Sequence, residues 1–147
     1  MTAATTEPAA QTAQSGADIM REFLKVSPFV GHLGIRLVSL EPDHAELTLP
    51  FSEPLITIGD TVHGGAISTL VDTAAMAASW STEAPPANLR GTTVSLNVSF
   101  TSAARSVDLT AKAGVVRRGK NLCTVDVDVT DPSGELVAKG LVTYKLG

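Results

Sequence analysis

A histidine and two glycines stand directly before the longest helical pattern of the chain, and an aspartate lies within that pattern. These residues are His63, Gly64, Gly65 and Asp72. The first N–H groups of a helix have no partner inside the helix and lie at the positive end of its dipole. They can stabilise a negative charge that develops on a carbonyl oxygen, while a carboxylate can act as a base or a nucleophile. The two features together are suited to chemistry at a carbonyl group.

The helix that must position these groups is predicted to begin just after the glycine pair and to end at Trp80. Its apolar residues recur at the i, i+3, i+4, i+7 spacing of one buried stripe, formed by Ile67, Leu70, Val71, Ala74, Ala75 and Ala78. Asp72 lies near the edge of this stripe, where burial of a carboxylate is costly without a partner. The purely structural alternative is a partly exposed Asp72 that bonds to Ser68, one turn earlier.

The spacing of Gly64 and Asp72 has a geometric consequence. Eight residues of helix cover roughly 12 Å, at about 1.5 Å per residue. A carboxylate cannot cross that gap to a carbonyl held at the N-terminus of its own helix. If both groups act on one substrate, they must come from two subunits, as in a two-fold dimer with antiparallel central helices. We therefore expect catalysis to require a homodimer.

Composition limits the remaining possibilities. The chain has 147 residues and a formal net charge of −4, which argues against a nucleic-acid partner because non-specific DNA affinity needs a surplus of Lys and Arg. The lone Cys123 cannot form an internal disulfide, and no Cys or His spacing fits a zinc site. No segment resembles a signal peptide or a membrane helix. We expect a cytoplasmic protein without metal or membrane partner, with a disordered tail over residues 1–16 and one domain over residues 17–147.

The rest of the chain is mostly strands. Residues 17–26 have a helical pattern that Ser27-Pro28 ends, residues 29–34 are expected to form a turn and residues 51–62 a loop. Strands are predicted over residues 35–41, 45–50, 93–101, 107–116, 122–130 and 136–146. In residues 93–101 a strict period of two places Val94, Leu96, Val98 and Phe100 on one face and Thr93, Ser95 and Asn97 on the other. Short turns imply antiparallel pairing, so the class is α+β, an antiparallel sheet wrapped around one long helix.

At this point the motifs resemble a known family. His63-Gly64-Gly65, followed by Asp72 and by the segments Gly91–Asn97, Arg118–Lys120 and Gly134–Gly140, is similar to the hotdog-fold acyl-CoA thioesterases of the phenylacetate-pathway (PaaI-like) type. The resemblance covers roughly residues 17–147. It implies that the N–H of Gly64 polarises the thioester carbonyl and that Asp72 is the general base or nucleophile. It also implies that Thr93 places the water and that His63 orients the loop and contacts the thioester end.

Further residues are expected to bind substrate. The family often has Asn or Gln six residues before the histidine, where this chain has Thr57, and Gly three residues before it, where this chain has Asp60. Arg117, Arg118 and Lys120 form either a solvated turn or a clamp on the coenzyme A phosphates. The expected substrate-binding set is Gly65, Thr57, Asp60, Ser68, Asn97, Arg117, Arg118 and Lys120. Trp80, Met76 and Phe51 either line an acyl or aryl tunnel or fill the core.

The leading hypothesis is an acyl-CoA thioesterase without a cofactor, in which coenzyme A is part of the substrate, and which forms a homodimer and a dimer of dimers. The alternatives are an enoyl-thioester hydratase on the same fold and a non-catalytic acyl-CoA binding protein. The sequence leaves open the acyl group, coenzyme A against an acyl-carrier protein as carrier, and base against nucleophile for Asp72.

Overall fold

The computed structural model describes residues 13–147, so most of the predicted tail lies outside the described residues. Helix α1 (Gly16–Val26) begins at residue 16, one residue earlier than predicted, and the hydroxyl of Ser15 caps it by accepting a hydrogen bond from the N–H of Asp18 at 3.1 Å. The backbone N–H groups of Gly16 and Ala17 donate to the carbonyls of Ala84 and Thr82. These bonds fix the start of α1 against the segment that follows the central helix.

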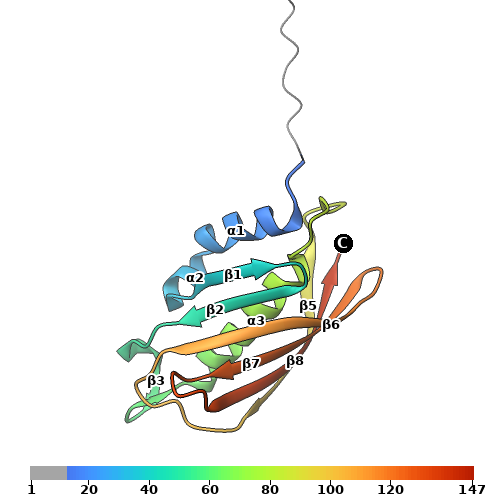
Figure 1. Cartoon of the computed structure of the whole chain (residues 1–147). Coiled ribbons are helices and arrows are strands. Elements are labelled where there is room, and N and C mark those ends of the chain that lie inside the picture. Colours follow the sequence, from blue (N-terminus) through green and yellow to red (C-terminus); the bar gives the residue numbers. More distant parts are fainter. Residues whose placement is uncertain (1–12) are drawn as a thin grey trace, which may run out of the picture.

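A six-stranded antiparallel sheet wraps around one long helix, α3 (Gly64–Trp80), as Figure 1 shows. The strand order is β1-β2-β6-β7-β8-β5. The strands are β1 (Arg36–Glu41), β2 (His44–Leu49), β5 (Gly91–Phe100), β6 (Leu109–Arg118), β7 (Leu122–Thr130) and β8 (Leu136–Leu146). The predicted class, an antiparallel α+β sheet around a central helix, is confirmed.

The core lies between α3 and the concave face of the sheet. All six residues of the predicted apolar stripe are buried, and they face strands whose inward residues are small or β-branched, such as Ala111, Val125 and Val142. Helix and sheet are in close contact at Gly140 of β8, where an added Cβ would overlap the side chain of Val71. A residue without a side chain at position 140 therefore lets the helix lie against the sheet backbone.

Three local expectations were wrong. Residues 29–34 were expected to form a turn, but Pro28–Leu33 is a short helix, α2, with proline in its first turn, where a missing N–H has no cost. The expected loop over residues 51–62 contains the 3₁₀ helix η1 (Glu53–Leu55) and the small hairpin β3 (Ile56–Ile58) and β4 (Thr61–Val62). The third is the pairing of successive strands that the short turns implied, because β5 does not pair with the next strand, β6, but forms the sheet edge beside β8.

The strict alternation predicted for β5 is also wrong, because the strand contains a bulge. Thr93 pairs with Tyr144 and Ser95 with Thr143, so Val94 is an extra residue with no partner of its own. A bulge of this kind reverses the side-chain alternation beyond it. Thr93 therefore faces α3 together with Leu96, although the period of two placed them on opposite faces.

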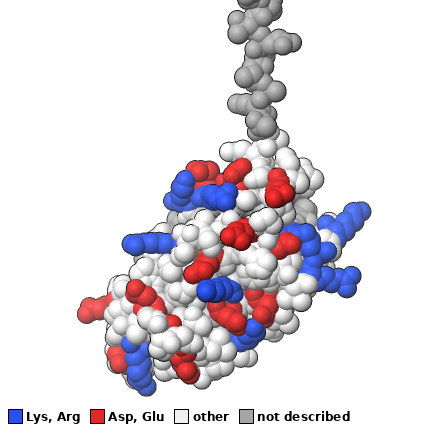
Figure 2. Space-filling model, in the orientation of Figure 1, with Lys and Arg blue, Asp and Glu red and all other residues white. Residues whose placement is uncertain are grey.

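Acidic and basic side chains are interleaved on the face of the molecule that Figure 2 presents. The ammonium group of Lys139 in β8 contacts both Asp126 and Asp128 of the neighbouring strand, at 2.6 and 2.7 Å. Within residues 13–147, no helix is both long enough and apolar enough to cross a bilayer.

Candidate active site

Asp72 is held by a single side chain from the sheet. The hydroxyl of Thr93 donates a hydrogen bond to Oδ1 of Asp72 at 2.6 Å, and both residues are half-buried. The alternative in which Ser68 is the partner of Asp72 does not hold in the described chain. The carboxylate thus has one oxygen fixed by a charge-assisted hydrogen bond, and it lies in mid-helix at the boundary between the core and the exposed edge of the sheet.

Tyr144 completes this region and was not singled out from the sequence. It is the cross-strand partner of Thr93, and its hydroxyl accepts a hydrogen bond from Nε1 of Trp80 at 3.1 Å. Burial raises the pKa of the Tyr144 hydroxyl, the hydrogen bond from Trp80 opposes that rise, and the negative charge of Asp72 adds to it. The influence of that charge places Tyr144 and Asp72 in one electrostatic environment.

The mouth of α3 is built by His63, which serves as its N-cap. Nδ1 of His63 accepts a hydrogen bond from the N–H of Gly65 at 2.7 Å. This bond requires Nδ1 to be unprotonated, so the ring hydrogen of the neutral imidazole lies on Nε2. A Cβ at position 65 would lie 2.9 Å from Nδ1 and would disturb the cap. The second glycine of the motif is therefore needed for the capping geometry.

Gly64 is the first residue of α3, and its N–H has no hydrogen-bond acceptor among the described residues. It lines a groove of about 440 Å³ together with Thr57, Ile67 and Phe100. The Phe100 ring lies close by, with its Cζ 3.2 Å from where a Cβ on Gly64 would be. The backbone donor at position 64 is therefore available beside a groove, as an oxyanion site requires.

One chain does not bring the donor and the carboxylate together. Gly64 and Asp72 belong to the same helix, and eight residues of helix separate their Cα atoms by roughly 12 Å along the axis. The structure thus unites Asp72 with Thr93 at one place, and His63, Gly64, Gly65 and Thr57 at another.

Three other expected substrate-binding residues have surroundings of their own. Asp60 forms an exposed ion pair with Arg105 at 2.9 Å. Asn97 pairs with Leu141 on the convex face of the sheet and donates to the hydroxyl of Ser95. Ser68 lies on α3 one turn before Asp72 and is half-buried. Their roles in substrate binding stay predictions.

A second bulge lies in β6, beside the residues expected to bind the coenzyme A phosphates. Val115 pairs with Val125 and Arg117 with Thr124, so Val116 is the extra residue and Arg118 faces inward opposite Cys123. A strict alternation from Val115 would have turned residue 118 outward. Arg117 and Lys120 remain exposed. The clamp on the coenzyme A phosphates stays a prediction, and these two side chains are the ones that could form it.

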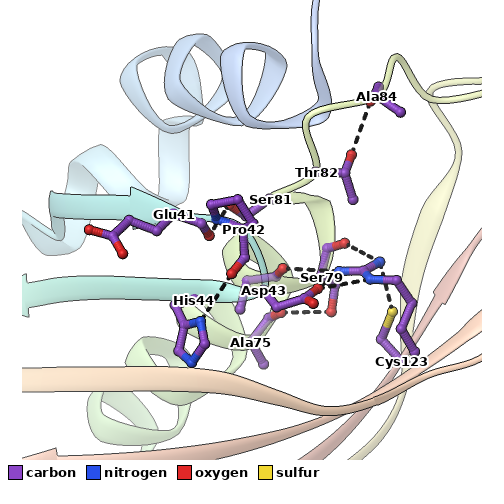
Figure 3. Close-up of polar contacts among 12 residues, drawn as sticks. Glu41, Pro42, Asp43, His44, Ala75, Ser79, Ser81, Thr82, Ala84 and Cys123 are labelled. Atoms are coloured by element: carbon purple, nitrogen blue, oxygen red, sulfur yellow. Dashed lines mark hydrogen bonds and ion pairs between the residues drawn. The ribbon is translucent and has the colours of Figure 1, made fainter.

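Arg118 instead reaches the C-terminal end of α3, where Figure 3 shows polar contacts around Asp43, Ser79 and Cys123. Its guanidinium donates to the carbonyl of Ser79 and to Sγ of Cys123 at 2.9 and 3.2 Å, and it forms an ion pair with Asp43 at 2.6 Å. A cation at this end of a helix satisfies open carbonyls and opposes the dipole. Burial raises the pKa of the Cys123 thiol, an effect that the Arg118 charge reduces. No sequence signal distinguishes this capping role from a substrate contact, because it depends on the bulge.

Within residues 13–147, no three His, Cys, Asp or Glu side chains gather as a metal site would need. The N–H of Gly64 can polarise a carbonyl, and Asp72 can supply a carboxylate.

Comparison with known proteins agrees with this chemistry. A family model described as "Thioesterase superfamily" matches residues 59–138, which include the mouth of α3, Asp72 and Thr93. Acyl-coenzyme A thioesterase 13 of Homo sapiens is 33% identical over 139 residues, which cover 91% of this chain and 96% of the human protein.

Two solved structures have the same fold. A thioesterase family protein from Silicibacter pomeroyi is 26% identical, with a TM-score of 0.82 over 90% of this chain and 100% of that one. The E. coli PaaI protein from the phenylacetic acid degradation operon has a TM-score of 0.78 over 90% of this chain and 94% of its own. At 21% identity it supports the fold alone. The chain therefore belongs to the thioesterase superfamily, with its hotdog fold, and is a thioester hydrolase.

Proposed function

We propose that the chain is an acyl-CoA thioesterase whose active sites each combine Gly64 of one subunit with Asp72 of the other. The observation that carries this proposal is the position of Asp72. It is half-buried and accepts a hydrogen bond from Thr93 at 2.6 Å, but it lies too far along α3 to act on a carbonyl that is bound to the N–H of its own Gly64. Coenzyme A as the carrier is supported by the human relative, which is named an acyl-coenzyme A thioesterase. We expect the enzyme to act in the cytoplasm.

In the proposed reaction, Asp72 takes a proton from a water molecule, and the resulting hydroxide adds to the thioester carbon. The N–H of Gly64 from the other subunit donates to the oxygen that becomes negative. The tetrahedral intermediate collapses, the carbon–sulfur bond breaks, and the proton passes to the thiolate of coenzyme A. The products are a carboxylic acid and coenzyme A. If Asp72 is instead the nucleophile, its carboxylate adds to the thioester carbon and expels the thiolate of coenzyme A, which leaves a mixed anhydride. Water then hydrolyses the anhydride, releases the carboxylic acid and restores Asp72.

The exposed edge of the sheet supports a dimer. Strand β5 is ten residues long, and one of its edges has no strand partner among the described residues. Three of its apolar side chains are exposed: Val94 at 53%, Leu96 at 41% and Phe100 at 53%. A long apolar edge of this kind favours pairing with another chain. Antiparallel pairing of two β5 strands would continue the sheet across the two-fold axis and place the two α3 helices side by side. Two such dimers would form the expected dimer of dimers through other faces.

The proposal is tested with a panel of acyl-CoA thioesters and a reagent that detects the released thiol. Asp72→Ala should lower kcat/KM by at least about 10²-fold, because general acid–base catalysis contributes roughly 10²–10⁴, while the variant keeps the wild-type assembly. Glu83→Ala is the matched control, because it removes an exposed carboxylate in the segment that follows α3. An unchanged rate in Asp72→Ala would remove the proposed mechanism.

The same panel separates the alternatives. Tight binding of acyl-CoA without release of thiol would favour a binding protein. Loss of the enoyl absorbance without release of thiol would favour a hydratase.

A further inference from the structure

A cavity of about 280 Å³ lies between α1 and the C-terminal half of α3. Helix α1 contributes Ile19, Met20 and Phe23, and α3 contributes Met76 and Trp80. Tyr144 of β8, Leu89 and the first residue of β5, Gly91, complete the wall. No charged side chain lines it, and the two polar wall groups, the Tyr144 hydroxyl and Nε1 of Trp80, are bonded to each other at 3.1 Å. Such a cavity suits an apolar ligand.

The cavity lies beside Asp72. Met76 follows Asp72 by four residues, so both project from the same face of α3 one turn apart. On the sheet side, Tyr144 is the cross-strand partner of Thr93, which holds Asp72. An acyl group whose carbonyl carbon is next to Asp72 could therefore extend directly into the cavity.

The two helices that enclose the cavity are fixed to each other. The N–H groups of Gly16 and Ala17 bond to the segment after α3, and a Cβ at position 16 would overlap the carbonyl of Trp80. Phe23 nevertheless remains 44% exposed, although it lines the cavity. An apolar side chain in this position gains burial when an apolar group enters.

We propose that this cavity is the acyl subsite, that it takes a medium-length alkyl or an aryl group, and that Ile19 and Phe23 of α1 limit the length of the chain. The assignment rests on the proposed function, since it is Asp72 that locates the reacting carbonyl. A cavity of roughly 150 Å³ is enough for benzene. The volume of about 280 Å³ thus corresponds to roughly ten or eleven carbon atoms on that scale.

The test is the chain-length profile of kcat/KM for linear acyl-CoA thioesters from acetyl to hexadecanoyl. For the wild type, kcat/KM should rise by roughly fourfold per methylene group that enters the cavity and should level off or fall beyond a chain of roughly ten carbons. Phe23→Ala opens the wall, so the ratio of kcat/KM for dodecanoyl-CoA to that for hexanoyl-CoA should rise at least about fourfold. Ile19→Phe narrows the cavity, so the same ratio should fall.

Phe29→Ala is the matched control, because Phe29 is an exposed phenylalanine of the neighbouring helix α2 and does not line the cavity. If Phe23→Ala and Ile19→Phe give the wild-type profile while the wild type hydrolyses the panel, the subsite assignment is overturned and the proposed function stands.

A binding readout keeps the test independent of turnover. Trp80 is the only tryptophan of the chain and lines the cavity, so its fluorescence reports occupancy. The non-hydrolysable thioether S-octyl-coenzyme A should change the Trp80 emission, whereas coenzyme A alone should not. Equal effects of the two ligands would contradict an acyl group in this cavity. If no thioester of the panel releases thiol but only the octyl ligand changes the fluorescence, the proposed function is refuted. The assignment of the cavity as the site that binds the acyl group then still stands.

Discussion

The hydroxyl of Thr93 meets Oδ1 of Asp72 at 2.6 Å because Val94 is an extra residue in β5. Without that bulge, Thr93 would face the convex side of the sheet, and the carboxylate on α3 would lose its hydrogen-bond donor. The bulge therefore connects a local irregularity of an edge strand with the orientation of the proposed catalytic group. Bulges are frequent next to active sites because they redirect a side chain.

Replacement of Thr93 by valine tests this connection. Thr93→Val removes the donor while keeping the β-branched shape, so kcat should fall about 10- to 100-fold, since hydrogen bonds to charged groups contribute about 1.5–3 kcal/mol. Thr93→Ser retains the hydroxyl and should keep most of the activity. Steady-state kinetics of the two variants at equal protein concentration provide the measurement. Equal kcat for valine and serine would show that the hydroxyl is not used.

The proximity of Asp72 and Tyr144 can be measured by titration. The chain has one tyrosine, so the absorbance of tyrosinate reports Tyr144 alone. Burial and the charge of Asp72 raise its pKa from the usual value of 10.0, and Asp72→Asn removes the charge, so the variant should titrate at lower pH than the wild type.

The same shift predicts how stability depends on pH. Above pH 10 the unfolded chain releases the tyrosine proton before the folded chain does, so the free energy of unfolding should fall as pH rises from there. An unshifted titration in Asp72→Asn would place Asp72 away from the hydroxyl.

Close packing of α3 on the sheet predicts a large effect at Gly140. An added methyl group would overlap Val71, so Gly140→Ala should lower the free energy of unfolding by about 1–3 kcal/mol. The double variant Gly140→Ala/Val71→Ala should recover part of that loss, because it makes room for the methyl group. Urea unfolding measures both. Gly114→Ala is the control, since its Cβ would meet nothing closer than 3.5 Å, and a loss there as large as at Gly140 would contradict the packing argument.

Arg118 is expected to matter for stability. Arg118→Met removes the ion pair with Asp43 and the hydrogen bond to the Ser79 carbonyl, so the free energy of unfolding should fall by about 1.5–3 kcal/mol, the range for hydrogen bonds to charged groups. Arg117→Met, at an exposed position of the same strand, should stay within about 0.5 kcal/mol of the wild type. If the two variants are equally stable, Arg118 does not cap α3.

Much of the fold follows from patterns that the sequence displays directly. The stripe from Ile67 to Ala78 is buried as its 3.6-residue spacing predicts, and Val125 and Val127 of β7 alternate inward as a period of two requires. Such patterns are local, so they can be recognised without knowledge of the neighbouring strands. The family motif at His63-Gly64-Gly65 similarly marks the mouth of α3.

What the sequence did not predict depends on contacts between distant segments. The place of β5 beside β8 is not encoded in the length of any turn, and the bulges at Val94 and Val116 exist only relative to partner strands. A shift of one residue in register moves every later side chain of the strand to the opposite face of the sheet. For this reason the inward positions of Thr93 and Arg118 could not be derived from alternation alone.

The shared active site is tested most directly by mixing two inactive chains. Gly64→Pro removes the N–H of the first helical residue, a position where proline is tolerated, and Asp72→Ala removes the carboxylate. Each variant alone should be inactive. In a mixed dimer isolated with two different tags, one site regains both groups, so the mixed dimer should recover about half of the wild-type rate. A mixed dimer as inactive as its parents would contradict an active site built from Gly64 of one subunit and Asp72 of the other.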